Sequence, residues 1–142
     1  MTEKGNHCSY TTHYHVVFPV KYRKALLNEG VTKELKEISK GIEERYFLEI
    51  EQMGTDGDHI HLLLSFHPKY SIGSVVRLYK SVTAKLLFKK FPQLRKELWG
   101  GEFWSDGYYV ATVGEKGNWA VVEAYVKSQG NTTHEPLNLQ LW

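Results

Sequence analysis

Apolar and polar residues alternate in several short segments of the chain, and in two longer segments the apolar residues recur at helical intervals. Residues 10–20 alternate with many β-branched and aromatic side chains, which predicts a strand. The side chains expected on one face of this strand are Tyr14, Val16, Phe18 and Val20.

Helical spacing follows in residues 31–47 and again in residues 71–91. The apolar positions of the first helix are Val31, Leu35, Ile38 and Ile42, and those of the second are Ile72, Val75, Tyr79, Val82 and Leu86. Ser71 precedes the second helix as a predicted N-cap, and Pro92 ends it.

Residues 48–68 contain two apolar runs separated by a Gly/Asp cluster, which predicts a hairpin that turns in the region 54–57. Beyond the second helix, residues 93–99 predict a further helical turn, and the Asp106-Gly107 pair predicts a turn beside one or two strands. A last helix is expected from Asn118 to Gly130.

The predicted order is strand, helix, strand, strand, helix, strand. This order is typical of ferredoxin-like α+β domains, also called RRM-like, in which helices cover mainly one face of an antiparallel sheet. We therefore expect a single domain over residues 1–142, with the other sheet face available for function.

Composition narrows the function classes only slightly. The chain has 142 residues and a formal net charge of +2, so a nucleic-acid interface must come from local clustering of basic residues. A single cysteine, Cys8, excludes an internal disulfide framework. No apolar signal region or run of ~20 apolar residues is present, so we expect a soluble cytoplasmic protein without a membrane partner.

Two histidines, His59 and His61, flank Ile60 at the start of an apolar run. Residues two apart in a strand share a face and lie about 6.6 Å apart along the chain. The pair is either part of a buried strand or two ligands of a metal. A histidine-triad phosphoryl enzyme is disfavoured, because residue 63 is leucine. The similar pair His13 and His15 is interpreted as structural.

The expected last helix carries Tyr125 and Gln129 one turn apart on one face. Gln129 could supply a third metal ligand. Alternatively, Tyr125 is a core tyrosine of an amphipathic helix and Gln129 is a solvated residue near the helix end. Spacing alone favours this second interpretation.

Basic residues cluster between positions 71 and 100, with aromatic residues interleaved. Positive charge beside aromatic faces suits single-stranded nucleic acid, whereas the alternative is a solvated helix face with core aromatics. The basic residues are Arg77, Lys80, Lys85, Lys89, Lys90, Arg95 and Lys96.

Four separated blocks of the sequence resemble the HUH single-tyrosine transposases of small single-stranded-DNA insertion sequences, a superfamily that includes the REP-associated tyrosine transposases. The blocks are "YHVVFPVKYRKALL", "GDHIHLLLSF", the long segment from "VVRLYKS" to "VATVG", and "VEAYVKSQG". They occur in order through about residues 10–130, and the tail 131–142 lies outside the resemblance with no assigned role.

The resemblance implies that His59, His61 and Gln129 bind a divalent metal and that Tyr125 is the nucleophile. It implies cleavage and rejoining of single-stranded DNA, of hairpin-containing element ends, through a 5′-phosphotyrosine and a free 3′-hydroxyl. Three neutral ligands with open positions suit Mg²⁺ or Mn²⁺ rather than structural zinc. We expect the histidines to be exposed on the sheet face, so that their removal has little effect on stability.

The resemblance also implies a homodimer with composite sites, in which the histidines come from one subunit and the tyrosine helix from the other. Gly114 and Gly117 would let that helix swing, or they merely serve a turn. Lys21 and Arg23 become expected DNA-backbone contacts beside the basic patch. Two alternatives stay open: a noncatalytic single-stranded nucleic-acid-binding module, and a domesticated relative that nicks repeated chromosomal hairpins.

Overall fold

The computed structural model describes residues 3–5, 8–10 and 12–113. Its elements in chain order are β1 (Glu3–Gly5), β2 (Cys8–Tyr10), β3 (His13–Pro19), the 3-10 turn η1 (Lys21–Arg23), α1 (Glu29–Arg45), β4 (Leu48–Thr55), β5 (His59–Phe66), α2 (Ile72–Lys90), α3 (Leu94–Glu97) and β6 (Tyr109–Val113). The expected helix 118–130, the glycines at 114 and 117, and the tail lie outside the described residues.

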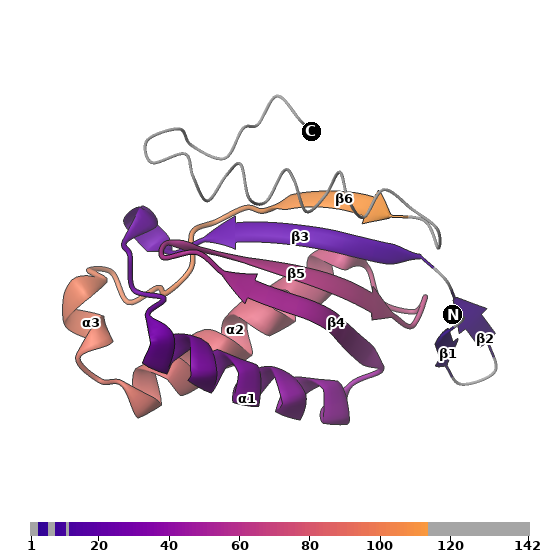
Figure 1. The fold of residues 1–142 in the computed structure, drawn as a ribbon, viewed down its shortest axis with the longest axis horizontal. Helices are drawn as coiled ribbons and strands as arrows, with labels where there is room; N and C mark the ends of the chain where they lie inside the picture. Colours follow the sequence, from indigo (N-terminus) through magenta and orange to yellow (C-terminus); the bar gives the residue numbers. More distant parts are fainter. Residues whose placement is uncertain (1–2, 6–7, 11, 114–142) are drawn as a thin grey trace.

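The main sheet has the strand order β4-β5-β3-β6, and each neighbouring pair is antiparallel (Figure 1). Together with α1 between β3 and β4, and α2 between β5 and β6, this order makes the split βαβ arrangement of a ferredoxin-like domain. The predicted α+β fold is therefore confirmed.

The first predicted strand, residues 10–20, is divided in the structure. Its central part forms β3, whereas Tyr10 belongs to β2 and pairs with Glu3 of β1 in a small separate hairpin. Alternation along the chain predicts extended backbone but not which strand is the partner, so it did not reveal this hairpin.

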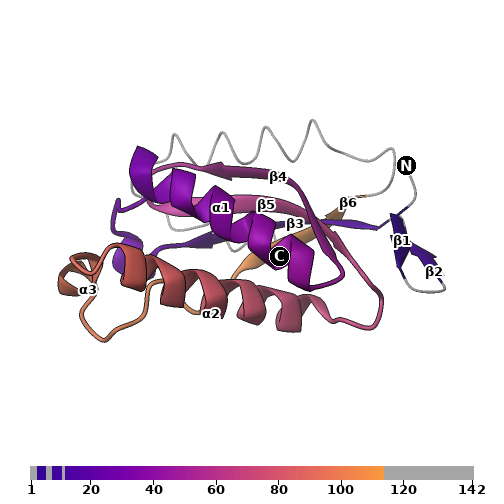
Figure 2. The same cartoon turned by 90° about the horizontal axis from the view of Figure 1, so that it is seen from below.

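Helices α1 and α2 lie side by side against the same face of the sheet, as Figure 2 shows. Val16 and Phe18 of β3 point to this face, together with Ile60 and Leu62 of β5. The predicted inner positions of α1 are buried beneath the sheet, and Asn28 caps the helix by accepting a hydrogen bond from the Val31 amide. The alternate residues of β3 and β5 consequently occupy the sheet face turned away from the helices.

Helix α2 begins with the predicted Ser71 cap, but its buried face is displaced from the predicted one. Leu86 is 37% exposed, whereas Thr83 and Leu87 are fully buried. The cause lies in the segment after α3, because the Trp104 indole packs on α2 and donates a 2.9 Å hydrogen bond to Oγ1 of Thr83. A partner so distant in sequence cannot be read from the spacing of α2 alone. No helix among the described residues is long and apolar enough to cross a membrane.

Candidate active site

His59 and His61 both lie on the sheet face turned away from α1 and α2. In the β3–β5 pairing, His59 is opposite Pro19 and His61 is opposite Val17. Ile60 between them belongs to the core on the other face. The predicted shared face of the two histidines is therefore confirmed.

The imidazole of His59 is held by its neighbour in sequence. Nδ1 of His59 lies 2.9 Å from Oδ1 of Asp58, and Nε2 is buried without a hydrogen-bond partner among the described residues. A carboxylate at Nδ1 favours the tautomer with the proton on that nitrogen, which leaves the lone pair on Nε2. This is the arrangement of a metal-binding histidine with an outer carboxylate.

The prediction that the histidines are exposed is wrong for His59, whose exposed fraction is 3%. A buried polar atom without a partner costs free energy unless something binds it. His59 therefore contributes to packing as well as to the site, and replacing it with alanine would leave a cavity.

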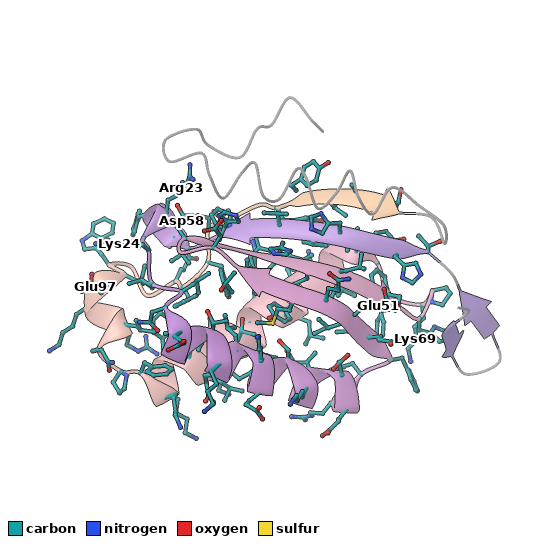
Figure 3. The ribbon with its side chains drawn as sticks, in the orientation of Figure 1. Arg23, Lys24, Glu51, Asp58, Lys69 and Glu97 are labelled. Carbon is teal, nitrogen blue, oxygen red and sulfur yellow. The ribbon has the colours of Figure 1, made fainter. Side chains whose placement is uncertain are left out.

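Arg23 extends the Asp58–His59 pair toward the surface. Its Nε lies 3.3 Å from Oδ2 of Asp58, and Figure 3 shows these two residues together. One carboxylate therefore joins the Arg23 guanidinium to the His59 imidazole. The backbone that positions Arg23 is unusual, because Tyr22 and Arg23 have φ values of 61° and 53°. This left-handed region costs a non-glycine residue about 1–2 kcal/mol, which makes η1 a strained turn beside the histidine site.

His61 lies over a glycine of the neighbouring strand. Gly54 of β4 pairs with His61, and a Cβ added to Gly54 would meet the imidazole at Nε2 and Cε1. The ring therefore occupies the space that a side chain at position 54 would take. The two glycines of the Gly/Asp cluster have different roles. Gly57, with a φ of 68°, allows the turn, and Gly54 leaves room for the His61 ring.

His15 is part of the same cluster, although the sequence suggested only a structural role. Its ring is fully buried and meets His61 edge to face, with 5.8 Å between centroids. Burial and the neighbouring His61 lower the pKa of His15 from its ordinary value of 6.5 to about 4. His15 is thus neutral at physiological pH and adds no positive charge beside the two candidate ligands. His13 lies 2.8 Å from the Glu51 carboxylate.

The predicted DNA-binding residues near β3 are engaged with acidic partners. Lys21 donates a hydrogen bond of 2.9 Å to Glu102, and this partner raises the pKa of the lysine. Arg23 is bound to Asp58 as described above. Contacts of Lys21 or Arg23 with DNA stay a prediction.

The three predicted DNA-binding residues of α2 differ in their surroundings. Lys80 is partly buried, and its ammonium donates 2.7 Å hydrogen bonds to the carbonyl oxygens of Ser105 and Gly107. Burial lowers its pKa. Arg77 and Lys80 line an open groove of ≈ 690 Å³ beside the 101–108 segment, whereas Lys85 is exposed. Lys80 therefore has a structural role that the sequence did not reveal.

The residues that the structure describes contain no group of three or more His, Cys, Asp and Glu side chains that could hold a metal ion. The two histidines would need a further ligand, and the predicted one, Gln129, lies outside the described residues together with the predicted nucleophile Tyr125. The described part of the site is therefore the pair of imidazoles with its Asp58 and Arg23 support.

A model of the IS200-like transposases matches residues 8–129. The chain belongs to this family. It is 37% identical over 127 residues to the ISDra2 transposase TnpA of Deinococcus radiodurans, covering 89% of this chain and 90% of that protein. It is 32% identical over 123 residues to a Salmonella typhimurium transposase for insertion sequence element IS200, covering 87% and 80% of the two chains.

Solved structures agree with this assignment. A transposase crystal structure from Deinococcus radiodurans R1 superposes with a TM-score of 0.72 at 33% identity, covering 89% of this chain and 97% of that one. A REP-associated tyrosine transposase bound to a REP hairpin gives a TM-score of 0.56 at 12% identity, covering 91% and 73%, a likeness of fold.

In this transposase the sequence reasoning missed three contributors to the histidine site. The sequence predicts Gly54 only as part of the turn region 54–57 and His15 only as a structural residue, and it assigns Asp58 no role of its own. The one available signal was the Asp directly before His59, because a carboxylate is the common outer partner of a metal-binding histidine.

Proposed function

We propose that this transposase cuts and rejoins single-stranded DNA by transesterification, with Tyr125 as the nucleophile. The phenolic oxygen would lose its proton and form a bond to a DNA phosphorus while the bond from that phosphorus to the 3′ oxygen breaks, so that the proton lost by the phenol balances the one gained by the 3′ oxygen. The 3′ oxygen takes up a proton and leaves as a hydroxyl, and the tyrosine keeps the 5′ phosphate. The reverse reaction with a new 3′-hydroxyl would rejoin DNA without ATP.

The proposed metal ligands are His59, His61 and Gln129. The donor set fits a divalent ion, because Nδ1 of His59 is held by Asp58 and its buried Nε2 has no hydrogen-bond partner among the described residues. That observation carries the proposal. When bound, Mg²⁺ or Mn²⁺ would withdraw charge from a phosphate oxygen. Asp58 would keep the His59 lone pair directed at the ion, and Arg23 would hold the Asp58 side chain in place.

The decisive experiment incubates the protein with labelled single-stranded ends of its flanking DNA and Mg²⁺, and detects a covalent adduct on a denaturing gel. Tyr125→Phe should abolish the adduct and retain DNA binding, because only the nucleophilic oxygen is removed. An adduct that survives in this variant would contradict the assignment of the nucleophile.

The metal site is tested best at His59, because a substitution there can keep the hydrogen bond to Asp58 while removing the atom at the position of Nε2. In His59→Asn a short amide can still donate to Asp58 but nothing reaches the position of Nε2, so calorimetry should show loss of Mn²⁺ binding. His59→Gln places an amide atom closer to that position and should retain weaker binding. His13→Asn is the matched control and should bind Mn²⁺ normally. Equal Mn²⁺ binding by His59→Asn and the parent protein would rule out His59 as a ligand.

The proposed assembly is a homodimer with composite sites, in which the histidines of one subunit work with Tyr125 of the other. Within the described part of the chain, β4 and β6 are the outer strands of the main sheet, and outer strands tend to be paired or covered. Mixing inactive Tyr125→Phe protein with inactive His61→Ala protein, under conditions of subunit exchange, should restore adduct formation. Sites built within single subunits would leave every mixture inactive.

The proposed substrate is a single strand with a hairpin, because a protein of the same fold is bound to a REP hairpin. Membership of the transposase family favours a catalytic protein over a noncatalytic binding module. A domesticated transposase that nicks repeated hairpins would use the same residues. The DNA that flanks the gene, rather than the protein, therefore distinguishes a domesticated transposase from one that moves an element.

A further inference from the structure

Two large aromatic side chains lie exposed beside the histidine site. Tyr22 of η1 is 49% exposed and Trp99, just after α3, is 77% exposed. Their rings meet edge to face, with 6.0 Å between centroids and an interplanar angle of 64°. We call this pair the Tyr22–Trp99 platform. Two exposed rings in contact offer an accessible aromatic surface, which suits a flat aromatic ligand.

The platform is held in place from both sides. The Tyr22 hydroxyl donates a 2.9 Å hydrogen bond to the carbonyl oxygen of Trp99. Tyr22 has left-handed backbone, and Gly100 with a φ of 98° turns the chain directly after Trp99. Strained backbone of this kind is concentrated at functional sites, where the surrounding structure maintains it. The strained residue here is Tyr22, whose ring forms one half of the platform.

Lys21 lies beside the Tyr22 ring of the platform, and Lys24 follows Tyr22 by two residues in the chain. Nζ of Lys21 lies 5.6 Å from the centre of the Tyr22 ring. Lys24 forms a 3.6 Å ion pair with Glu97, and both side chains are about half exposed. Such surface pairs contribute little to stability, so a phosphate can replace the carboxylate at small cost. The platform thus combines exposed rings with available positive charge.

The platform is joined to the candidate metal ligands through adjacent residues. Arg23 follows Tyr22 in the chain and binds Asp58, which in turn binds the His59 imidazole. Figure 3 shows Arg23, Asp58, Lys24 and Glu97 together at one end of the molecule, with Lys69 at the opposite end. A DNA strand that has a phosphate at His59 and runs toward Arg23 would reach this platform.

We propose that Tyr22 and Trp99 stack an unpaired base of the DNA strand close to the cleaved phosphate. The inference rests on the proposed single-stranded substrate. Stacking needs an accessible aromatic face rather than hydrogen-bond donors, and the exposed indole provides that face. The platform would accept any base, because every base has an aromatic face, and would fix the position of the strand rather than read its sequence.

The test measures binding without chemistry, in the full-length Tyr125→Phe protein. Fluorescence anisotropy gives the Kd for the labelled strand and for a series of strands that each lack one base. Trp99→Ala should weaken binding about 5- to 150-fold, the range expected for one stacked base. Trp99→Phe, which retains a ring, should recover part of that loss.

The base-deletion series identifies the stacked base. Removing one particular base should weaken the parent about as much as Trp99→Ala does, and should have little further effect in Trp99→Ala, because the same contact is lost in both. Phe47→Ala removes an exposed ring beside Lys69 and is the matched control. In this control, removal of the same base should still weaken binding.

The inference would be overturned if Trp99→Ala protein binds the strand as tightly as the parent. It would also be overturned if removing a base, at every position tested, weakens binding equally in the parent and in Trp99→Ala. A lowered Tm in Tyr22→Phe together with unchanged binding in Trp99→Ala would mean that the pair only clamps two loops. These binding assays need no cleavage, so the two proposals can fail separately. If base removal and Trp99→Ala act through the same contact but the active protein forms no adduct, the cleavage proposal fails and the stacking proposal stands. If the adduct forms but the two changes act independently, the stacking proposal fails and the cleavage proposal stands.

Discussion

Replacing Gly54 with alanine should disable the histidine site while leaving the fold intact. Gly54 lies opposite His61 in the β4–β5 pairing, and its φ is not in the left-handed region, so alanine suits the backbone. The obstacle is the His61 ring. An added Cβ would lie 2.6 Å from Cε1 of His61, and Nε2 would be nearer still. The imidazole must therefore move.

The size of the movement sets the expected effect. Ordinary contact begins at 3.4 Å, so Cε1 has to retreat by at least about 0.8 Å. A misplacement of about 1 Å can reduce a catalysed rate about 100-fold. We expect a loss of that order in the rate of adduct formation, with weaker Mn²⁺ binding. Moving His61 from its preferred rotamer should cost about 0.5–1.5 kcal/mol of stability.

Adduct formation on a denaturing gel, Mn²⁺ calorimetry and urea unfolding would measure the three effects. Gly41→Ala is the matched control, because an added Cβ there meets nothing within 4 Å, and it should cleave normally. In a His61→Ala background, Gly54→Ala should have no further effect on Mn²⁺ binding. Wild-type cleavage by Gly54→Ala would refute a role for the His61 position in the reaction.

Three further predictions concern stability. Burial and the neighbouring His61 lower the pKa of His15 to about 4. As the pH falls from 6.5 to 4, the unfolded chain binds the proton before the folded one does, so the free energy of unfolding of the metal-free protein should fall by about 3 kcal/mol. His15→Leu should flatten this part of a urea-unfolding pH profile, and an unchanged slope would contradict the assignment. Burial raises the pKa of Tyr79 above 10, although a hydrogen bond with Ser39 opposes the shift. Stability should therefore be complete below pH 10 and decline above it, and thermal melts of Tyr79→Phe should show a smaller alkaline decline. Lys80→Met removes two hydrogen bonds to backbone carbonyls and should lower the free energy of unfolding by about 1–3 kcal/mol in urea titrations, whereas exposed Lys85→Met should change it by less than about 0.5 kcal/mol.

The sequence by itself determined the features that depend on neighbours a few residues apart. His59 and His61 share a face because side chains alternate along a strand. Ser71 caps α2 because its hydroxyl reaches the amide of Ser74 within the same turn. The order of strands and helices then leaves few alternatives to a ferredoxin-like sheet, since β-α-β connections have a preferred hand.

Tertiary structure alone decided how the histidines are surrounded. Gly54 meets His61 because β4 and β5 pair in one particular register, and a shift by one residue would put a different side chain there. His15 reaches His61 across the β3–β5 pair, and Thr83 is buried because Trp104 returns to α2. These contacts join residues far apart in the chain, and their energies depend on packing and register, which no local pattern of apolar and polar residues encodes.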